Sequence, residues 1–361
     1  MDFKQETKNF IKVVVYASTS LTYCYYIAKL IPKGFTRLLT FLPVVLLFVS
    51  IPLFFNSVHL IGAISFLISW LANFKLILFA FGKGPLSPPF ISLSHFLSFA
   101  CFPIGKHKNT TSSHKSSLMS YGLKGLLLVI FLKGYYDYGD QMTPMMGWIL
   151  LAFSVYFCLE VMLGLSSKIM GLILLEVELD PQFDKPYLST SLQDFWGRRW
   201  NVMVNRVLYP TVYNPVRTLS SRVIGRFWAP IPAILTTFAV SGLMHELIFF
   251  YFTRDWPTWD TMLFFCLHGV SLVMEIAIKK SVNNVVKWRL PHDHITTPFV
   301  VAFVFATSYW LFYPELMRCQ LVERAFEEYG AVINIAKGVI SPTLQYITAL
   351  HDDNKTISLK S

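Results

Sequence analysis

A single histidine lies deep inside a long apolar run of the sequence. His245 falls between Ala229 and Phe252, where Glu246 is the only formally charged side chain. An ionisable group at membrane depth has to face protein or a water-filled cavity, and such groups commonly mark proton relays or substrate sites. A buried histidine that is hydrogen-bonded to a neighbouring helix is the alternative, and position alone favours neither.

A second group of residues with chemical potential precedes this run. The stretch Ser191–Asn201 contains Arg198 and Arg199 together with Trp196 and Trp200. Guanidinium groups match the geometry of phosphates, so the two arginines could hold the phosphates of a soluble anionic cosubstrate. Arginines and aromatic residues also suit a membrane interface, where they bind lipid headgroups without any chemistry. The residue types leave both interpretations open.

The composition predicts the class of protein that must position these residues. Of the 361 residues, 54% are hydrophobic and only 14% are charged, whereas a soluble domain carries roughly 25% charged residues. We therefore expect an integral membrane protein. The five cysteines are odd in number and widely spaced, which predicts neither a disulfide framework nor a metal site. The mixed-charge start of the chain is unlike a secretory leader, so the first apolar segment is expected to be retained.

Apolar runs long enough to cross a bilayer predict about eight or nine transmembrane helices, because a core about 30 Å thick needs about 20 apolar residues per helix. The six clear runs are 38–55, 57–81, 141–165, 229–252, 259–278 and 298–314. Three weaker runs, which contain lysines or a proline, are 10–31, 118–132 and 330–350. Two shorter or proline-broken runs, 82–101 and 166–179, are expected to be interfacial or re-entrant.

The connecting loops separate by charge when the chain crosses at each of these runs. One side receives the loops with a basic excess, which are 32–37, 102–117, 180–228 and 279–294, and the other side receives the acidic ones. The positive-inside tendency therefore places the basic loops in the cytosol. The sequon at Asn109 then lies in the cytosol and should carry no sugar.

The same scheme predicts one membrane domain over residues 1–361. Its parts are N-terminal helices at 1–180, a cytosolic basic and aromatic segment at 181–228, helices around the histidine at 229–350, and a tail at 351–361.

Four stretches of the chain carry a family resemblance. They are Ser191–Asn201, Ser241–Tyr251, Trp70–Phe81 with Gly84–Leu86, and Leu311–Cys319. Together they resemble the plant wax synthase branch of the membrane-bound O-acyltransferases. The resemblance implies that family's helical membrane fold and the transfer of a fatty acyl group from coenzyme A to a lipid hydroxyl in the endoplasmic reticulum membrane. It also implies that no cofactor is bound, and that acyl-CoA is a cosubstrate.

The resemblance implies that Asn201 and His245 are the catalytic pair, and their chemistry agrees. A neutral imidazole can act as the general base that removes the proton of an attacking hydroxyl. The Asn201 amide could steady the thioester or the developing oxyanion. No serine or cysteine nucleophile is required, so direct transfer without an acyl-enzyme is the preferred mechanism. A membrane interior also excludes the water that would hydrolyse the thioester.

The remaining expected contacts with substrate lie beside these two residues. In the segment before the histidine they are Asp194, Trp196, Arg198, Arg199 and Trp200, and in the histidine run they are Gly242 and Glu246. Gly242 is small enough to ease close helix approach or to leave cavity space. His245 lies about 24 Å from the cytosolic end of its helix at ~1.5 Å per residue. The thioester must therefore reach it through a tunnel, and the lipid acceptor through a lateral opening.

Other motifs in the sequence give weaker support to other kinds of chemistry. The sequence His245-Glu246 begins like a zincin motif, but Phe249 stands where the second metal-binding histidine belongs. His292-Asp293-His294 supplies too few ligands for a metal site, so a solvated loop is the better interpretation. His268 and Glu275 share one helix face. We expect them to pair with neighbouring segments in preference to lining a chamber. Glu160 could either pair with a neighbouring segment or line the chamber, and the sequence does not favour one role.

Two other classes of function remain as alternatives. A transporter could use His245, His268, Glu160 and Glu275 around a central cavity, but the chain shows no paired halves. A noncatalytic lipid-binding scaffold is the third choice. Within the favoured class, the expected partners are acyl-CoA, a membrane-dissolved lipid alcohol and membrane lipids, with no nucleic acid and no metal. A long-chain fatty alcohol is the expected acceptor, and a sterol or diacylglycerol is the alternative; the motifs do not encode acyl chain length.

Overall fold

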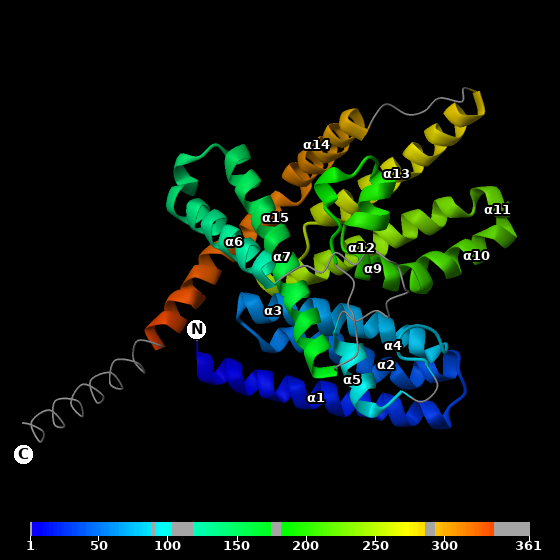
Figure 1. Ribbon diagram of the computed structural model, residues 1–361. Coiled ribbons are helices and arrows are strands. Elements are labelled where there is room, and N and C mark those ends of the chain that lie inside the picture. The colour runs from blue at the N-terminus through cyan, green and yellow to red at the C-terminus, as the bar shows by residue number, and fades with distance from the viewer. Residues whose placement is uncertain (1, 89–90, 103–117, 175–181, 286–292, 336–361) are drawn as a thin grey trace, which may run out of the picture.

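Every regular element that the structure describes is helical. The computed structural model describes residues 2–88, 91–102, 118–174, 182–285 and 293–335, and Figure 1 shows helices connected by short turns throughout these ranges. The predicted all-helical membrane fold is confirmed for this part of the chain. The predicted sequon at Asn109 and the tail at 351–361 lie outside it, as does most of the run at 330–350.

The N-terminal helices form the largest cluster of buried apolar side chains. Phe41 and Phe48 of one helix pack with Leu21 of another and with Tyr251, which belongs to the helix that carries His245. The elements are α1 (Phe3–Leu30), α2 (Phe35–Ser50), η1 (Ile51–Phe54), α3 (Val58–Ile64), the π-helical η2 (Ser65–Ala72), α4 (Asn73–Ala80) and α5 (Leu93–Cys101). A hydrogen bond of 2.5 Å from the Tyr251 hydroxyl to the Val49 carbonyl joins the two parts of the protein.

A helical hairpin follows. It consists of α6 (Leu118–Tyr138), η3 (Gly139–Gln141) and α7 (Pro144–Leu174). Lys124 of α6 pairs with Glu160 of α7 inside the apolar hairpin, so each charge has a partner where water is scarce. This contact gives Glu160 a structural role.

The segment between the hairpin and the histidine helix is a chain of short elements. They are η4 (Pro186–Leu188), α8 (Leu192–Asp194), the π-helical η5 (Phe195–Arg199), α9 (Val202–Leu208), the π-helical η6 (Tyr209–Tyr213), α10 (Asn214–Val223) and α11 (Gly225–Trp228). Gly225 has φ +80°, which lets α10 turn sharply into α11. Figure 1 shows α10 running beside α12 as a result.

The helix that carries His245 packs closely on its successor. These helices are α12 (Pro230–Thr253) and α13 (Asp260–Val285), and α14 (Asp293–Leu311), α15 (Tyr313–Arg318) and a helix at 321–335 complete the described chain. A Cβ atom added to Gly242 of α12 would lie 2.7 Å from the Met262 Sδ and 3.1 Å from the Met262 Cα of α13. Gly242 therefore permits the close approach of the two helices.

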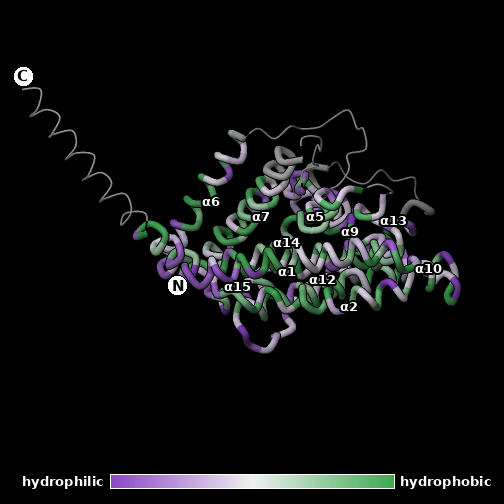
Figure 2. Tube along the Cα trace, turned by 90° about the horizontal axis from the view of Figure 1, so that it is seen from below, coloured by the Kyte–Doolittle hydropathy of each residue, from purple (hydrophilic) through white to green (hydrophobic). Residues whose placement is uncertain are grey.

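Five helices of the described residues are long and apolar enough to cross a membrane. They are Phe35–Phe54, Val58–Ala80, Pro144–Ser166, Gly225–Thr253 and Asp260–Ser281, and a sixth results if Thr296–Leu311 and Tyr313–Ile335, bent by 44°, count as one span. These correspond to the six clear runs of the sequence. Figure 2 shows hydrophobic residues along the helices.

The weaker predicted runs differ from the structure in detail. Runs 10–31 and 118–132 do form helices, but tyrosines and hydroxyl residues dilute α1, and charged residues dilute α6. Residues 166–174 continue α7 without a break, although the candidate span ends at Ser166, and the interfacial or re-entrant placement of 166–179 stays a prediction. No glycine or proline interrupts the chain at its start, which explains the continuation. The run 82–101 contains turns and the short α5.

The basic ends of several helices lie on one side of the molecule. In Figure 1 the end of α1, the turn between α10 and α11, and the end of α13 all lie toward the right, whereas the N-terminus lies toward the left. These right-hand ends carry Lys33, Arg222, Arg226, Lys279 and Lys280. The arrangement agrees with the charge separation expected from the loops.

Replacing Gly242 with alanine should destabilise the α12–α13 contact, because crowding of this kind costs roughly 1–3 kcal/mol in a packed interior. Gly125→Ala in α6 is the matched control, since a Cβ there meets nothing within 4 Å. Both changes gain the same helix propensity, about 1 kcal/mol. Thermal unfolding in detergent should give a lower Tm for Gly242→Ala than for Gly125→Ala; equal values would contradict the close packing.

Candidate active site

The ring of His245 is oriented by its own helix. Its Nδ1 lies 2.7 Å from the backbone carbonyl oxygen of Ser241, one turn earlier in α12. A carbonyl oxygen can only accept a hydrogen bond, so Nδ1 carries the proton. The neutral ring then presents a lone pair at Nε2, which is the atom able to accept a proton from a substrate.

Aromatic side chains from three other elements surround this ring. The Trp70 ring of η2 lies 5.4 Å away nearly edge-on, the Phe265 ring of α13 lies 4.5 Å away, and the Phe312 ring between α14 and α15 lies 5.9 Å away. His245 nevertheless remains half-buried, so part of its surface is accessible. The arrangement gives an apolar site in which an imidazole can accept a proton with little competition from water.

Trp70 and Phe312 were not among the site residues predicted from the sequence. Both belong to stretches that carry the family resemblance, Trp70–Phe81 and Leu311–Cys319, and this was the available signal. The structure brings these distant stretches together at His245.

Asp194 organises the basic segment that precedes α12. Its carboxylate lies 3.1 Å from Arg198 Nε and 2.6 Å from Arg199 Nε, and it accepts a 3.3 Å hydrogen bond from the Thr190 amide. Burial by itself would raise the pKa of this carboxyl, but the Arg199 and Thr190 hydrogen bonds and both arginine charges outweigh burial and leave the pKa below its usual range. Asp194 is thus an anchor for two arginines.

The two arginines differ in what they can offer a ligand. The side chain of Arg199 is 24% exposed, and its Nη1 also donates to the Asp184 carbonyl at 3.2 Å. The side chain of Arg198 is 78% exposed. Arg198 is therefore the arginine of this pair that is open to an anionic ligand, while Arg199 holds the segment together.

Trp196 connects the segment to the helices around His245. Its Nε1 donates to His268 Nδ1 at 3.1 Å, and His268 Nε2 in turn donates to the Thr307 hydroxyl at 2.9 Å. The Thr307 hydroxyl donates to the Phe303 carbonyl at 2.8 Å. Both nitrogens of His268 are used in this way, so the structural pairing expected for His268 is confirmed.

Glu275 makes a second connection between this segment and α13, seven residues after His268. Its carboxylate accepts from the Leu192 amide at 2.7 Å and from Lys279 at 2.7 Å, which confirms the pairing expected for Glu275. Trp196 meets α13 seven residues deeper than Leu192 does, or roughly 10 Å along the helix. Trp196 thus finds its hydrogen-bond partner within the candidate span Asp260–Ser281, and the cytosolic placement of the segment 181–228 stays a prediction.

Asn201 adopts a backbone conformation that few residues tolerate. Its φ of 41° and ψ of 65° are left-handed, and its side-chain oxygen caps α9 by accepting from the Val204 amide at 3.4 Å. Asparagine is among the residues best suited to both roles. The amide nitrogen stays available to donate to a ligand.

The sequence neighbours of Asn201 and His245, which are Trp200 and Met244, pack against the same buried cluster. Trp200, which precedes Asn201, stacks on Phe195 at 5.5 Å and packs against a cluster that includes Trp70 and Met203. Trp70 is one of the three aromatic residues that surround the His245 ring. The cluster therefore connects the two predicted catalytic residues, although it does not place them in contact.

The other predicted contacts in α12 serve the packing of helices. The Glu246 carboxylate is buried and accepts from the Met262 amide at 2.8 Å, in the first turn of α13. The space beside Gly242 is filled by Met262 and Phe265. Contact of Glu246 or Gly242 with substrate stays a prediction.

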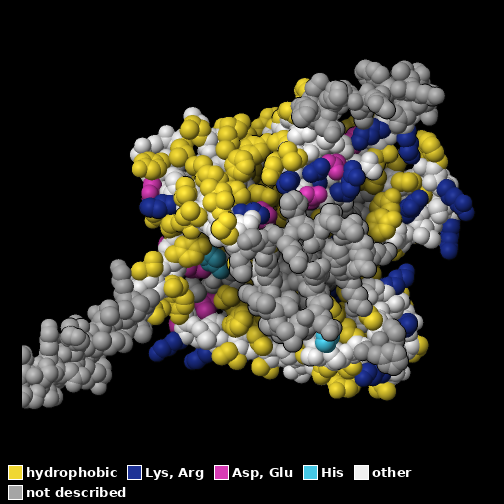
Figure 3. Space-filling model, in the orientation of Figure 1, with side chains coloured by type: hydrophobic (Ala, Val, Ile, Leu, Met, Phe, Trp, Pro, Cys, Tyr) yellow, Lys and Arg dark blue, Asp and Glu magenta, His cyan; other side chains and the backbone are white. Residues whose placement is uncertain are grey.

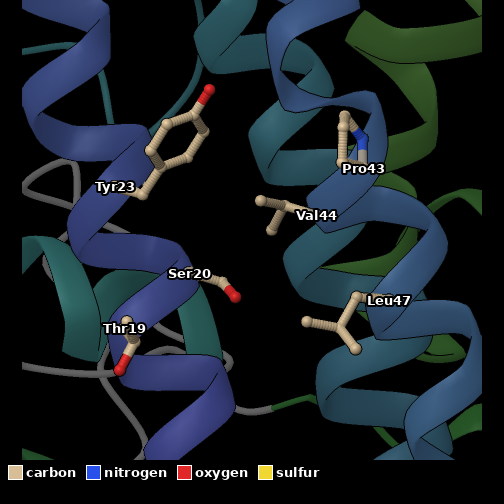
Figure 4. A pocket seen from close by; sticks show the side chains of 6 residues that line it. All are labelled: Thr19, Ser20, Tyr23, Pro43, Val44 and Leu47. Atoms are coloured by element: carbon tan, nitrogen blue, oxygen red, sulfur yellow. The ribbon is translucent and has the colours of Figure 1, made fainter.

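The described residues contain no metal-binding cluster, and the cavity between α1 and α2 lacks a base. Among the described residues, no group of three or more histidine, cysteine or acidic side chains could hold a metal ion; the side chains of His292, Asp293 and His294 lie outside the described part. A cavity of about 310 Å³ between α1 and α2 is lined by Thr19, Ser20, Tyr23, Pro43, Val44 and Leu47 (Figure 4). None of these six could act as a base near neutral pH.

Comparison with known proteins identifies the family. The model of the "Membrane bound O-acyl transferase family" matches residues 179–267, which include both Asn201 and His245. The chain is 44% identical over 333 residues to "Acyl-CoA–sterol O-acyltransferase 1" of Arabidopsis thaliana, which covers 90% of this chain and 95% of the relative. It is 39% identical over 344 residues to "Long-chain-alcohol O-fatty-acyltransferase" of Simmondsia chinensis, and this match covers 92% of this chain and 97% of the relative.

This chain belongs to the membrane-bound O-acyltransferase family. The relatives place it in the wax synthase-like branch, so the resemblance carried by its four motifs is confirmed. As a member of this family it is a multi-pass membrane enzyme of the O-acyltransferase class. The residues matched by the family model include His245, whose catalytic role stays a prediction at this point.

Asp194→Asn should destabilise the protein near neutral pH, because the half-buried Arg199 loses its charge partner, at a cost of about 1–3 kcal/mol. A carboxyl whose folded pKa lies below its unfolded value stabilises the fold above the unfolded pKa, and this stabilisation is lost as pH falls through the folded pKa. The Tm difference from wild type should therefore be present at pH 7 and shrink below about pH 3.9.

The control for this measurement is Asp137→Asn, which removes a carboxylate from an exposed pair with Lys133. Such pairs contribute about 0–1 kcal/mol, so its Tm should change little. A pH-independent loss in Asp194→Asn, or an equal loss in Asp137→Asn, would contradict the anchoring role.

Proposed function

We propose that this protein transfers the acyl group of acyl-CoA to the hydroxyl of a lipid alcohol in the endoplasmic reticulum membrane, with His245 as the general base. The observation that carries the proposal is the hydrogen bond between His245 Nδ1 and the Ser241 carbonyl, which leaves Nε2 as a proton acceptor. The family and its relatives support the class of reaction.

The proposed reaction is a direct transfer. His245 Nε2 takes the hydroxyl proton as the alcohol oxygen forms a bond to the thioester carbonyl carbon. The tetrahedral intermediate then breaks its carbon–sulfur bond, and the coenzyme A sulfur takes the proton back from Nε2. The Ser241 carbonyl stabilises the imidazolium through Nδ1–H in between. Products are the ester and free coenzyme A, and the histidine returns to its starting form.

Asn201 has the second role in this proposal. Its side-chain oxygen is used by the Val204 amide, so only the amide nitrogen is free to donate to the oxyanion. The cap and the left-handed backbone orient that donor, which reduces the reorganisation needed at the moment of reaction. We place the thioester carbonyl so that its oxygen faces this amide and its carbon lies beside the hydroxyl that is held at Nε2 of His245.

Arg198 is proposed to bind the phosphates of coenzyme A. It is largely exposed, and Asp194 orients it without covering the guanidinium. Trp196, Trp200 and Arg199 act in the same segment by fixing its position, through His268, Phe195 and Asp184 respectively.

The proposed acceptor is a long-chain fatty alcohol, and a sterol is the second candidate. Relatives named for each acceptor resemble the chain at similar identity, 39% for the long-chain-alcohol enzyme and 44% for the sterol enzyme. The shared motifs serve the common chemistry, so the acceptor depends on the shape of a pocket that several helices build.

A direct assay tests the proposed function. Microsomes from a host without such enzymes would receive acetyl-CoA or palmitoyl-CoA with hexadecanol, a sterol or diacylglycerol. We expect ester formation from one acceptor class, and its loss in an inserted and folded His245→Ala variant. If no pair of substrates yields an ester although the wild-type protein is folded, a transporter or scaffold function takes precedence.

Asn201→Asp should separate catalysis from folding. Aspartate keeps the capping oxygen and tolerates a left-handed backbone, but it lacks the amide donor. We expect kcat to fall by about 10²–10³, the usual effect of removing one oxyanion donor, with a Tm close to wild type. Asn201→Ala should lower both, because it also loses the cap. Normal kcat in Asn201→Asp would exclude the oxyanion role.

Arg198→Gln and Arg199→Gln form a matched pair. Each removes one guanidinium that pairs with Asp194. Arg198→Gln should raise the KM for acyl-CoA with little change in Tm, whereas Arg199→Gln should lower the Tm. Initial rates at varied acyl-CoA concentration give the KM, and thermal unfolding gives the Tm. An unchanged KM in Arg198→Gln would mean that this arginine contacts lipid headgroups or solvent and does not bind coenzyme A.

A further inference from the structure

The turn between α10 and α11 exposes an unusual run of apolar side chains. Val223 is 77% exposed, Phe227 is 66% exposed and Trp228 is 56% exposed, and Ile224 between them is also exposed. The turn itself is imposed by Gly225 with its positive φ. Contiguous exposed apolar residues of this kind mark a surface that contacts a partner or a membrane. We call residues 222–228 the basic–aromatic tip.

The charges of the tip are of one sign and one type. Arg222 and Arg226 are exposed, and no carboxylate of the described residues pairs with either. The chain contains no acidic residue and no lysine between Asp194 and Glu246, so the permanently charged residues of that interval are all arginines. Guanidinium groups bind phosphate oxygens in pairs, so the tip is complementary to phosphate-bearing ligands.

The position of the tip determines which phosphates it meets. The apolar span Gly225–Thr253 begins within the tip, so these residues lie where α12 enters the bilayer. Lys280, near the end of α13, places its Nζ 5.1 Å from the centre of the Phe227 ring and adds a third cation. Figure 3 shows Lys and Arg side chains at the right edge of the molecule, where Figure 1 draws the α10–α11 turn.

We propose that the basic–aromatic tip binds anionic phospholipids of the membrane surface. Phe227 and Trp228 lie at the headgroup level, where aromatic rings are favoured, while Arg222 and Arg226 contact the phosphates. A soluble phosphate ligand would leave the exposed apolar residues uncovered, whereas a lipid covers both kinds of side chain. This binding surface is separate from Arg198 and does not depend on the proposed reaction.

Fluorescence quenching in reconstituted vesicles tests this surface. The full chain would be placed in phosphatidylcholine vesicles that contain either brominated phosphatidylglycerol or brominated phosphatidylcholine at the same mole fraction. The part of the quenching that Trp228→Phe removes reports on the tip. We expect brominated phosphatidylglycerol to quench this part more strongly, and the ratio to fall to about one in the double variant Arg222→Gln, Arg226→Gln.

Two matched variants control for charge and folding. Lys4→Gln with Lys8→Gln removes two exposed positive charges at the opposite end of the molecule and should leave the ratio unchanged. Arg222→Lys with Arg226→Lys keeps the charge and should retain a ratio above one. A ratio of one in the wild type, retention of the preference in the glutamine double variant, or displacement of the lipid by free coenzyme A would each overturn the proposal.

Discussion

The hydrogen bond from His245 to the Ser241 carbonyl is the interaction on which the site depends. A polar ring in an apolar helix needs a partner, and this one takes it from its own backbone one turn away. One nitrogen is thereby satisfied and the other remains a base. His268, in the adjacent helix, shows the contrasting case. Trp196 and Thr307 occupy both of its nitrogens, so it joins segments together and has no lone pair left for chemistry.

The charged residues around this site also have two kinds of role: most hold segments together, and one is open to a ligand. Asp194, Arg199 and Glu275 use their hydrogen bonds to fix the segment before α12. Arg198 also pairs with Asp194 but is largely exposed at the surface. Glu246 holds the first turn of α13, and Gly242 lets that helix approach. Phe265 of α13 lies beside Gly242 and packs on the His245 ring. The site is therefore built on the α12–α13 pair, and the segment from Ser191 to Asn201 is attached to it.

The sequence predicts the helices and the family better than it predicts the roles of single residues. Apolar runs identified α12 and α13 because hydropathy is a local property. The shared motifs identified His245 and Asn201. The contacts of Trp70 and Phe312 with His245 could not be predicted, because they join stretches far apart in the chain. Neither could the difference between Arg198 and Arg199, since it depends on how the π-helical turn η5 directs two adjacent side chains. The depth reached by Trp196 likewise depends on a partner in another helix.

We propose that acyl transfer takes place at Nε2 of His245. The most direct measurement is an experimental structure of the protein with a nonreactive thioether analogue of acyl-CoA. We expect the atoms that replace the thioester to lie against Nε2, within reach of the Asn201 amide, while the Nδ1 hydrogen bond to Ser241 is kept. An analogue that binds with these atoms away from His245, or a structure in which Nε2 is hydrogen-bonded to another protein group, would contradict it.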